Sequence, residues 1–197
     1  MMFKHSKKKV SVPSLNEVQS ERKRIRRKDY YRQALRGTVS VLLVVAAVAV
    51  LIATLFLPIL QISGDSMSPT LEHDEIVVLL KTKKFERGDL IGLYYQGKIL
   101  LKRVIALPED EVAIDADGNV YINGELLEEP YVTDKGLGDC DLEFPYKVPG
   151  TSYFVMGDCR SNSVDSRNSV VGSIPQEDII GKVFIRVWPF SRFGFVF

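Results

Sequence analysis

The chain has 197 residues, of which 46% are hydrophobic and 26% are charged, with 14 glycines and 9 prolines. This composition excludes a collagen-like, low-complexity or wholly disordered chain. The formal net charge of +1 conceals an uneven distribution. Residues 1–36 contain 12 Lys/Arg and three Asp/Glu, a net charge of +9, and the remaining residues therefore have a net charge of −8. The sequence predicts a basic head followed by an acidic body.

A long apolar segment follows the basic head. No residue from Gly37 to Gly64 is charged, and Thr38–Leu60 consists of 23 mostly apolar residues. As an α-helix, this stretch is about 34 Å long, enough to cross a hydrocarbon core of about 30 Å. A core helix of this length would show a polar face, and none is present. The sequence therefore predicts a transmembrane helix over residues 37–61, which argues against nucleic-acid binding by the head.

The apolar segment also differs from a cleaved secretory signal. Such a signal has an apolar core of about 7–15 residues that ends in small residues before the cleavage site. Here the one A-x-A triplet, Ala47-Val48-Ala49, lies in the middle of the run. Because basic residues directly precede the span, we expect the N-terminus to stay in the cytoplasm. We expect residues 1–36 to be largely disordered, with at most a short helix over Leu15–Leu35, and residues 62–197 to form an exported domain.

The exported part consists of short β-rich segments separated by turn residues. Gln96-Gly97 and Asn123-Gly124 are typical hairpin turns, and Lys135–Tyr146 reads as an irregular surface loop. No amphipathic helix pattern is present, so the sequence predicts a mainly β, antiparallel domain of barrel-like or sandwich form. The expected strands are Glu75–Leu80, Leu90–Tyr95, Lys98–Ala106, Asn119–Leu127, Ser152–Met156 and Ile179–Trp188.

Ser66 and Lys102 are the first candidates for chemistry. Ser66 lies in a turn-rich stretch, within roughly 20 Å of the end of the span. Lys102 and Arg103 alternate in a predicted strand, so one of them must face an apolar or covered side. Burial disfavours the charged form of lysine, and the neutral amine can act as a general base where arginine cannot. Each residue also has a plain structural interpretation, as a turn former and as an edge-strand lysine.

The other polar residues help to choose a mechanism. Met156–Arg167 is a dense polar run that could support an active site or simply form a capped loop. A Ser-His-Asp triad needs an exported histidine, and His73 is the one available, in a polar stretch typical of an exposed turn. Lysine is therefore the better candidate base, because Ser-Lys variants of the triad exist.

Several segments in order resemble bacterial type I signal peptidases of the Gram-positive-like subgroup. The basic head and the anchor agree with the membrane topology of that family. The matching segments span most of the exported domain: GDSMSPTL (64–71), ERGDLI (86–91), LKRVIALPED (101–110), YINGELLEEPYV (121–132) and MGDCRSNSVDSR (156–167).

The resemblance implies a role for each catalytic residue. Ser66 would be the acyl-accepting nucleophile and Lys102 its general base. Ser163 would orient the lysine amine, and Asp165 and Arg167 would support the site. The backbone N–H of Ser66 would donate to the developing oxyanion.

The resemblance also implies the substrates and the surroundings of the enzyme. It implies a serine endopeptidase of the cell membrane that removes signal peptides from secreted preproteins after small residues at −3 and −1. No cofactor, metal or nucleic acid is expected. The lipid bilayer is a partner, and the secretion translocon is a further candidate. The residues expected to line the substrate pockets are Ile62, Met67 and Leu71.

The chain departs from the family pattern at a few positions. Gly64 stands where some relatives have a serine that completes the oxyanion hole, and Glu109 replaces the usual glycine of an LPGD turn. Cys159 and Ser161 stand where Asn and Asp are more common. Both cysteines, Cys140 and Cys159, are on the exported side, and the sequence leaves open whether they form a disulfide.

Alternative functions are an anchored extracellular binding module and an inactive peptidase homologue. A sortase-like transpeptidase would need a T-L-x-T-C pattern, and Cys159 follows Met156-Gly157-Asp158 instead. Self-cleaving repressors of the SOS type share Ser/Lys chemistry but carry an N-terminal DNA-binding domain, where this chain has its span.

Overall fold

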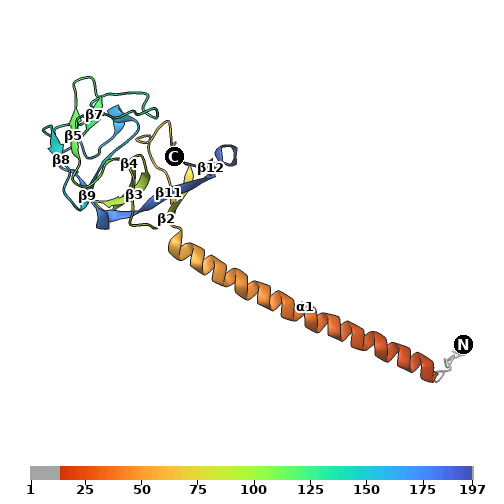
Figure 1. The fold of residues 1–197 in the computed structure, drawn as a ribbon. Coiled ribbons are helices and arrows are strands. Elements are labelled where there is room, and N and C mark those ends of the chain that lie inside the picture. The colour runs from red at the N-terminus through yellow and green to blue at the C-terminus, as the bar shows by residue number, and fades with distance from the viewer. Residues whose placement is uncertain (1–13, 197) are drawn as a thin grey trace, which may run out of the picture. The chain divides into compact units, whose positions relative to one another are not determined.

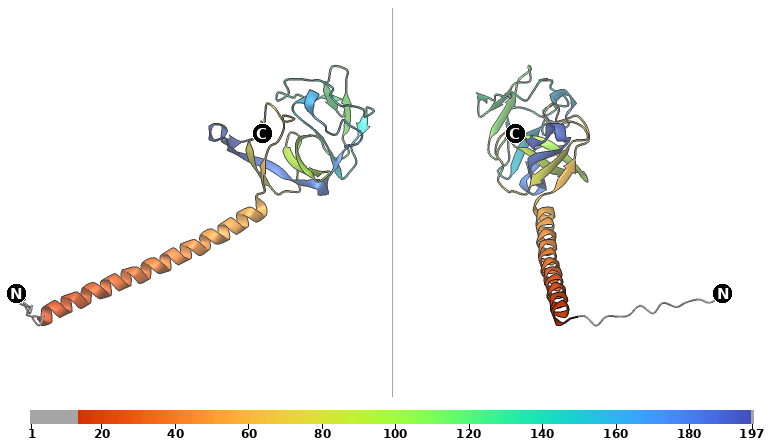
Figure 2. Two further views of the ribbon diagram at one scale, coloured as in Figure 1. Left: turned by 180° about the vertical axis from the view of Figure 1, so that it is seen from behind. Right: turned by 90° about the vertical axis from the view of Figure 1, so that its right-hand side faces the viewer.

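The computed structural model describes residues 14–196, so the expectation of disorder for residues 1–13 lies outside the described part. The chain divides into two compact units, with the boundary after Ile52. The first unit contains most of one long helix, and the second is built from short strands (Figures 1 and 2).

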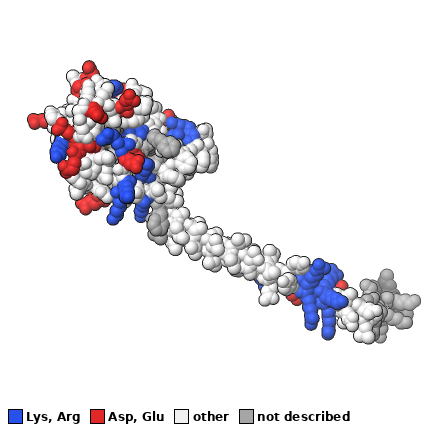
Figure 3. All heavy atoms as spheres, in the orientation of Figure 1, with Lys and Arg blue, Asp and Glu red and all other residues white. Residues whose placement is uncertain are grey.

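The helix α1 runs from Leu15 to Phe56 without interruption. The short helix expected over Leu15–Leu35 is therefore the first half of a longer element. Lysines and arginines gather near its N-terminal end, and a long uncharged stretch follows along the helix (Figure 3). Its most apolar window has a mean hydropathy of 2.5 and no buried residue, and among the described residues this is the one helix long and apolar enough to cross a membrane.

The end of α1 differs from the predicted end of the span at residue 61. The helix ends at Phe56, because Pro58 has no N–H to donate and disfavours the helical conformation of Leu57. Ile59–Gln61 then forms strand β1, which pairs with β2, Ile76–Leu80. The last three residues of the predicted transmembrane segment therefore belong to a sheet.

The second unit consists of two antiparallel sheets, which confirms the mainly β fold class. The larger sheet has the order β1-β2-β11-β3-β4-β9-β10, with β12 paired to β11, and the smaller has the order β7-β6-β5-β8. The strands not yet given are β3 (Leu90–Tyr95), β4 (Lys98–Ala106), β5 (Glu111–Ile114), β6 (Val120–Ile122), β7 (Glu125–Leu126), β8 (Tyr146–Lys147), β9 (Ser152–Met156), β10 (Ile174–Pro175), β11 (Ile179–Trp188) and β12 (Gly194–Phe195). Three short 3-10 helices complete the unit: η1 (Arg160–Asn162), η2 (Gln176–Asp178) and η3 (Phe190–Arg192).

The predicted strands β3, β4, β9 and β11 have the expected bounds, and both expected hairpins are present. The strands that the sequence did not predict are β1, β5, β8, β10 and β12. Each has two to four residues, too few to show the alternation that identifies a strand. These short segments form strands because they pair with strands elsewhere in the chain.

Strand β4 lies in the middle of the larger sheet and positions the site. It pairs with β3 on one side, where Lys102 faces Ile91, and with β9 on the other, where Arg103 faces Met156. The apolar residues at the end of β4 and in β9 pack against the smaller sheet. That shared core contains Ile105, Ala106, Val112, Val120, Ile122, Val148, Phe154 and Met156.

Both cysteines, Cys140 and Cys159, are free thiols in the structure and are partly exposed. Burial raises the pKa of the Cys140 thiol, and the nearby charge of Arg167 opposes this shift. The disulfide that the sequence left open is therefore not formed here.

The turn after β4 places Glu109 in a backbone conformation that favours glycine. Glu109 has a φ of 70°, a left-handed conformation that costs a residue with a Cβ atom about 1–2 kcal/mol. Its carboxylate lies 3.1 Å from Lys147 Nζ, but both side chains are mostly exposed, so this ion pair contributes little. Glu109 therefore occupies a strained position with small compensation.

We expect Glu109→Gly to be more stable than Glu109→Ala by about 1 kcal/mol. Both variants lose the ion pair with Lys147, but only the glycine variant relieves the left-handed backbone. Chemical denaturation of the detergent-solubilised chain measures the difference. Equal stability of the two variants would contradict backbone strain at this position.

Candidate active site

Ser66 lies in the turn that joins β1 and β2, and two kinds of bond fix this turn. Within it, the N–H of Ser68 donates to Asp65 O at 3.0 Å and that of Leu71 to Met67 O at 2.9 Å. Outside it, Ser66 O accepts the N–H of Cys159 at 3.1 Å. The turn is thereby joined to the loop that follows β9, which is 93 residues away in the sequence. Ser66 itself is half-buried.

Lys102 projects from β4 into the interior, with 3% of its surface exposed. Its Nζ donates to Ser163 Oγ at 3.0 Å. In the described part of the chain, no carboxylate lies within ion-pair distance of this amine. Burial lowers the pKa of Lys102, with the charge of Asp165 opposing this effect and that of Arg167 adding to it. The environment therefore favours the neutral amine.

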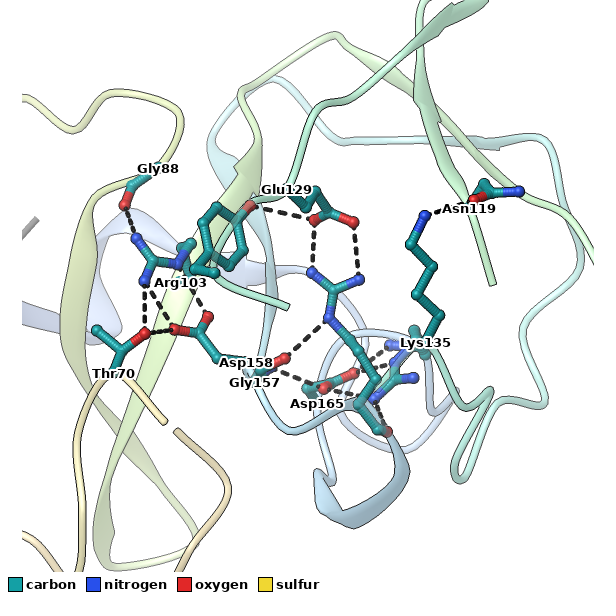
Figure 4. Close-up of polar contacts among 12 residues, drawn as sticks. Thr70, Gly88, Arg103, Asn119, Glu129, Lys135, Gly157, Asp158 and Asp165 are labelled. Atoms are coloured by element: carbon teal, nitrogen blue, oxygen red, sulfur yellow. Dashed lines mark hydrogen bonds and ion pairs between the residues drawn. The ribbon is translucent and has the colours of Figure 1, made fainter. Parts of the chain in front are cut away.

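Arg103, the next residue in β4, is also buried, with 2% of its surface exposed. The sequence predicted that Lys102 or Arg103 would face a covered side of the strand. In the structure both faces of β4 are covered, and both side chains are buried. Arg103 Nε and Nη2 donate to the Asp158 carboxylate at 2.9 and 2.7 Å, and Nη1 donates to Gly88 O at 2.8 Å (Figure 4). The ring of Tyr131 stacks on the guanidinium at 3.8 Å. Unlike Lys102, Arg103 has a full set of partners and a structural role.

Gly157 is the point at which the Ser66 turn meets the loop after β9. A Cβ atom at this position would lie 2.4 Å from Ser66 O and 2.3 Å from Ser163 Oγ. Since such distances are not tolerated, only glycine allows Ser66 and Ser163 to approach the same backbone so closely. The Gly157 N–H donates to Asp165 Oδ2 at 3.0 Å (Figure 4).

Asp165 and Arg167 lie behind Ser163 and bind each other. Arg167 Nε and Nη2 donate to the Asp165 carboxylate at 2.8 and 2.9 Å, and both residues are about 1% exposed. Burial alone would raise the pKa of Asp165. The hydrogen bonds from Arg167 and Ser163 and the charge of Arg167 together lower this pKa by more than burial raises it, so that the net shift is downward. Asp165 is therefore ionised, and its charge is largely directed to Arg167.

Sequence reasoning missed a second buried ion pair beside the site. Arg160 Nη1 donates to Glu129 Oε2 at 3.0 Å, and Arg160 Nε donates to Gly157 O at 2.9 Å. The hydroxyl of Tyr131 donates to the same Glu129 carboxylate at 3.1 Å. Glu129 and Tyr131 are part of the matched segment YINGELLEEPYV, which was the available signal, but nothing in that segment identified Arg160 as the partner.

Two cavities meet at Ser66. A cleft of 430 Å³ is lined by Ser66 and Lys102 together, and reaches Asn162 and Val164. A small cavity of 70 Å³ also adjoins Ser66 and is lined by Ile62 and Met67 among others. Leu71, the third expected pocket residue, is fully buried in the same core cluster as Ile62 and Met67, and does not line either cavity.

The structure therefore gathers the five residues expected to be catalytic or supporting. Ser66 and Lys102 share the cleft, Ser163 bonds to Lys102, and Asp165 and Arg167 lie behind Ser163. A larger cavity of 880 Å³, lined by Lys81, Gln176 and their neighbours, contains none of these residues.

Comparison with known proteins finds a matching family and several relatives of this chain. The family model described as "Signal peptidase, peptidase S26" matches residues 35–188. Signal peptidase I U of Bacillus subtilis is 36% identical over 167 residues, covering 77% of this chain and 86% of the relative. A probable signal peptidase I-2 of Synechocystis is 34% identical over 145 residues, covering 68% and 64%. The crystal structure of a signal peptidase I from Enterococcus faecalis is 30% identical and covers 52% of this chain and 98% of its own, with a TM-score of 0.44.

Replacing Lys102 by methionine should stabilise the fold near neutral pH, on the order of 1 kcal/mol. The folded state lowers the pKa of this amine from 10.5, so burial of the amine destabilises the fold wherever the unfolded chain would bind the proton. The stability that Lys102→Met gains over the parent should therefore be largest below the lowered pKa of Lys102. This gain should disappear as the pH rises through 10.5.

Chemical denaturation of the parent and of Lys102→Met across this pH range measures the difference in their free energies of unfolding. Lys98→Met is the matched control, because Lys98 lies in the same strand but is exposed, and it should give no comparable gain. If Lys102→Met were less stable than the parent at neutral pH, the amine would not be under the desolvation described here.

Proposed function

The chain belongs to the signal peptidase family, peptidase S26, and we propose that it is a membrane-anchored serine endopeptidase in which Ser66 and Lys102 form the catalytic dyad. The observation that supports this most directly is the Lys102 amine. It is buried, is not ion-paired in the described part of the chain, and shares a cleft with Ser66. A lysine in such a setting can take a proton at a pH where an exposed lysine cannot.

In the proposed reaction, Ser66 Oγ attacks the carbonyl carbon of the scissile peptide while Lys102 Nζ accepts the hydroxyl proton. The oxyanion receives the N–H of Ser66. The Lys102 ammonium then protonates the leaving amine, which departs as the new N-terminus of the mature protein. Water, deprotonated by the same amine, hydrolyses the acyl-enzyme and restores Ser66.

Ser163, Asp165 and Arg167 are positioning residues in this proposal. Ser163 Oγ accepts a hydrogen bond from Lys102 Nζ at 3.0 Å, which orients the amine. Arg167 holds the Asp165 carboxylate with two hydrogen bonds, so that this charge does not pair with Lys102. A direct pair with a carboxylate would stabilise the ammonium and remove the base.

The small cavity beside Ser66 fits the proposed specificity. With a volume of 70 Å³ and with Ile62 and Met67 in its lining, it has room for a small side chain next to the scissile bond. We propose that it accepts the small residue of a signal peptide at −1, and that the small residue at −3 binds against the neighbouring lining. Leu71 contributes from behind, by packing in the same cluster as Ile62 and Met67.

We propose that α1 anchors the enzyme in the cell membrane as a single span. Its apolar stretch carries no buried residue, and the lysines and arginines near its N-terminal end (Figure 3) favour a cytoplasmic N-terminus. The catalytic unit would then be extracellular, where it meets the signal peptides of secreted preproteins close to the bilayer. The translocon that delivers these preproteins is a further partner in this proposal.

Ser66→Ala and Lys102→Arg should each reduce cleavage of a preprotein in detergent to the uncatalysed background. The first variant removes the nucleophile, and the second keeps the positive charge but cannot be deprotonated. Time courses resolved by gel electrophoresis or mass spectrometry measure the products. An active Lys102→Arg enzyme would exclude the dyad, and an inactive parent chain would favour a binding module or an inactive homologue.

The cleavage rate should rise with pH through the pKa of Lys102, which burial lowers from the 10.5 of an ordinary lysine. The neutral amine is the reactive form, and lowering the pKa brings that form to lower pH. A kcat/KM profile measured with a single substrate locates this rise. A rate that does not change until the pH reaches the range of an exposed lysine would contradict the role of burial.

Protease added to right-side-out vesicles should digest residues 62–197 and leave the basic head intact. This follows from the positive charge that precedes the span. Antibodies against each end of the chain distinguish the fragments. Protection of the C-terminal unit would reverse the proposed topology.

A further inference from the structure

His73 contacts the backbone two residues before Ser66. The N–H of Gly64 donates to His73 Nδ1 at 3.0 Å. This bond continues a short ladder between the two arms of the turn. In that ladder, Ile62 N–H donates to Glu75 O at 2.8 Å, and Asp74 N–H donates to Ile62 O at 3.0 Å. The next rung is made by a side chain, because His73 Nδ1 takes the place of a backbone carbonyl.

The segment that this rung fixes lines both of the cavities that meet at Ser66. Ser63, Gly64 and Ser66 line both the 430 Å³ cleft and the 70 Å³ cavity. The segment is held at Ile62 by the backbone ladder and at Ser66 by the bond to Cys159. Between these points, Ser63, Gly64 and Asp65 are exposed, and the His73 ring is the side chain that ties them to the other arm. Its removal would therefore loosen the backbone immediately before the nucleophile.

The bond depends on the protonation state of the ring. Nδ1 accepts a hydrogen bond only in the neutral form with the proton on Nε2, and protonation of Nδ1 turns the acceptor into a second donor. Nε2 faces Asp74 Oδ1 at 3.6 Å, and Gln61 Nε2 donates to the same oxygen at 3.1 Å. The neighbouring Glu72 carboxylate is paired with Arg192 of η3 at 2.9 Å. Asp74 is thus the charged group that faces the ring directly.

We propose that His73 is a positioning residue for the cleavage reaction, acting through Gly64 on the segment that precedes Ser66. This rests on the proposed function, and it gives His73 no part in proton transfer to or from substrate. By accepting the Gly64 N–H, His73 holds the segment that lines both cavities and keeps Ser66 aligned with the substrate. Loss of this bond would align the substrate and Ser66 less well.

Two variants separate the bond from the ring. His73→Ala removes the acceptor, whereas His73→Asn places an oxygen near the position of Nδ1 that does not titrate. Glu72→Ala is the matched control, because it alters the same turn and leaves the Gly64 bond in place. Each is made in the full-length chain in detergent, and kcat/KM is measured with one preprotein under the same conditions.

We expect His73→Ala to lower kcat/KM about three- to tenfold, the effect of losing one hydrogen bond. Glu72→Ala and His73→Asn should stay within about twofold of the parent, because each keeps an acceptor for the Gly64 N–H. Rescue by His73→Asn is a result that a general disturbance of the turn would not give. A fully active His73→Ala enzyme would overturn the proposal.

Hydrogen exchange followed by mass spectrometry gives a second measurement that does not need activity. The peptide containing Gly64 should exchange faster in His73→Ala than in the parent or in Glu72→Ala. If the parent cleaves no substrate, the proposed function fails while this arm still tests the bond. Unchanged exchange in His73→Ala would contradict the role of His73 whatever the activity.

Discussion

The architecture of the site depends on one constraint, which is that the Lys102 amine must be buried without becoming an ion pair. A buried lysine beside a carboxylate would stay protonated, since the opposite charge offsets the loss of hydration. The carboxylates near Lys102 are directed elsewhere, because Asp158 is held by Arg103 and Asp165 by Arg167. Lys102 donates to the Ser163 hydroxyl instead. The two arginines therefore favour the neutral amine, because they pair with the carboxylates that would otherwise keep Lys102 charged.

A second constraint, steric in origin, brings the parts together. Ser66, Lys102 and Ser163 come from three separate segments, and the segments of Ser66 and Ser163 meet at Gly157. Arg160 holds its carbonyl and Asp165 accepts from its N–H, so both sides of this backbone are fixed. The ion pair of Arg160 with Glu129 extends the same support to the segment that follows β7. The position of the active site thus depends on contacts made far along the chain from Ser66.

Much of this could be read from the sequence, and the remainder has physical reasons. Long strands such as β4 and β11 show alternation or apolar runs, and Asn123-Gly124 specifies its hairpin locally, so those elements were predictable. Strand β1 was not, because Ile59–Gln61 continues an apolar run and only the effect of Pro58 and the pairing with β2 separate it from the helix. Resemblance to a family indicated Ser66, Lys102 and Ser163. The partners of Arg103 and Arg160 depend on tertiary contacts, which a charge pattern does not encode.

The adjacent pair Lys102 and Arg103 shows how the chain divides structural and chemical work between two cations. Both are buried in β4, and both faces of the strand are covered. A guanidinium stays charged at any pH at which proteins fold, so Arg103 can only be accommodated by a complete set of acceptors, which Asp158, Gly88 and Thr70 supply. An ammonium can lose its proton, and Lys102 is given few acceptors. Such an arrangement costs stability while the amine is charged and becomes useful once it is neutral. In the proposed mechanism, that cost is the condition for Lys102 to take the proton of Ser66.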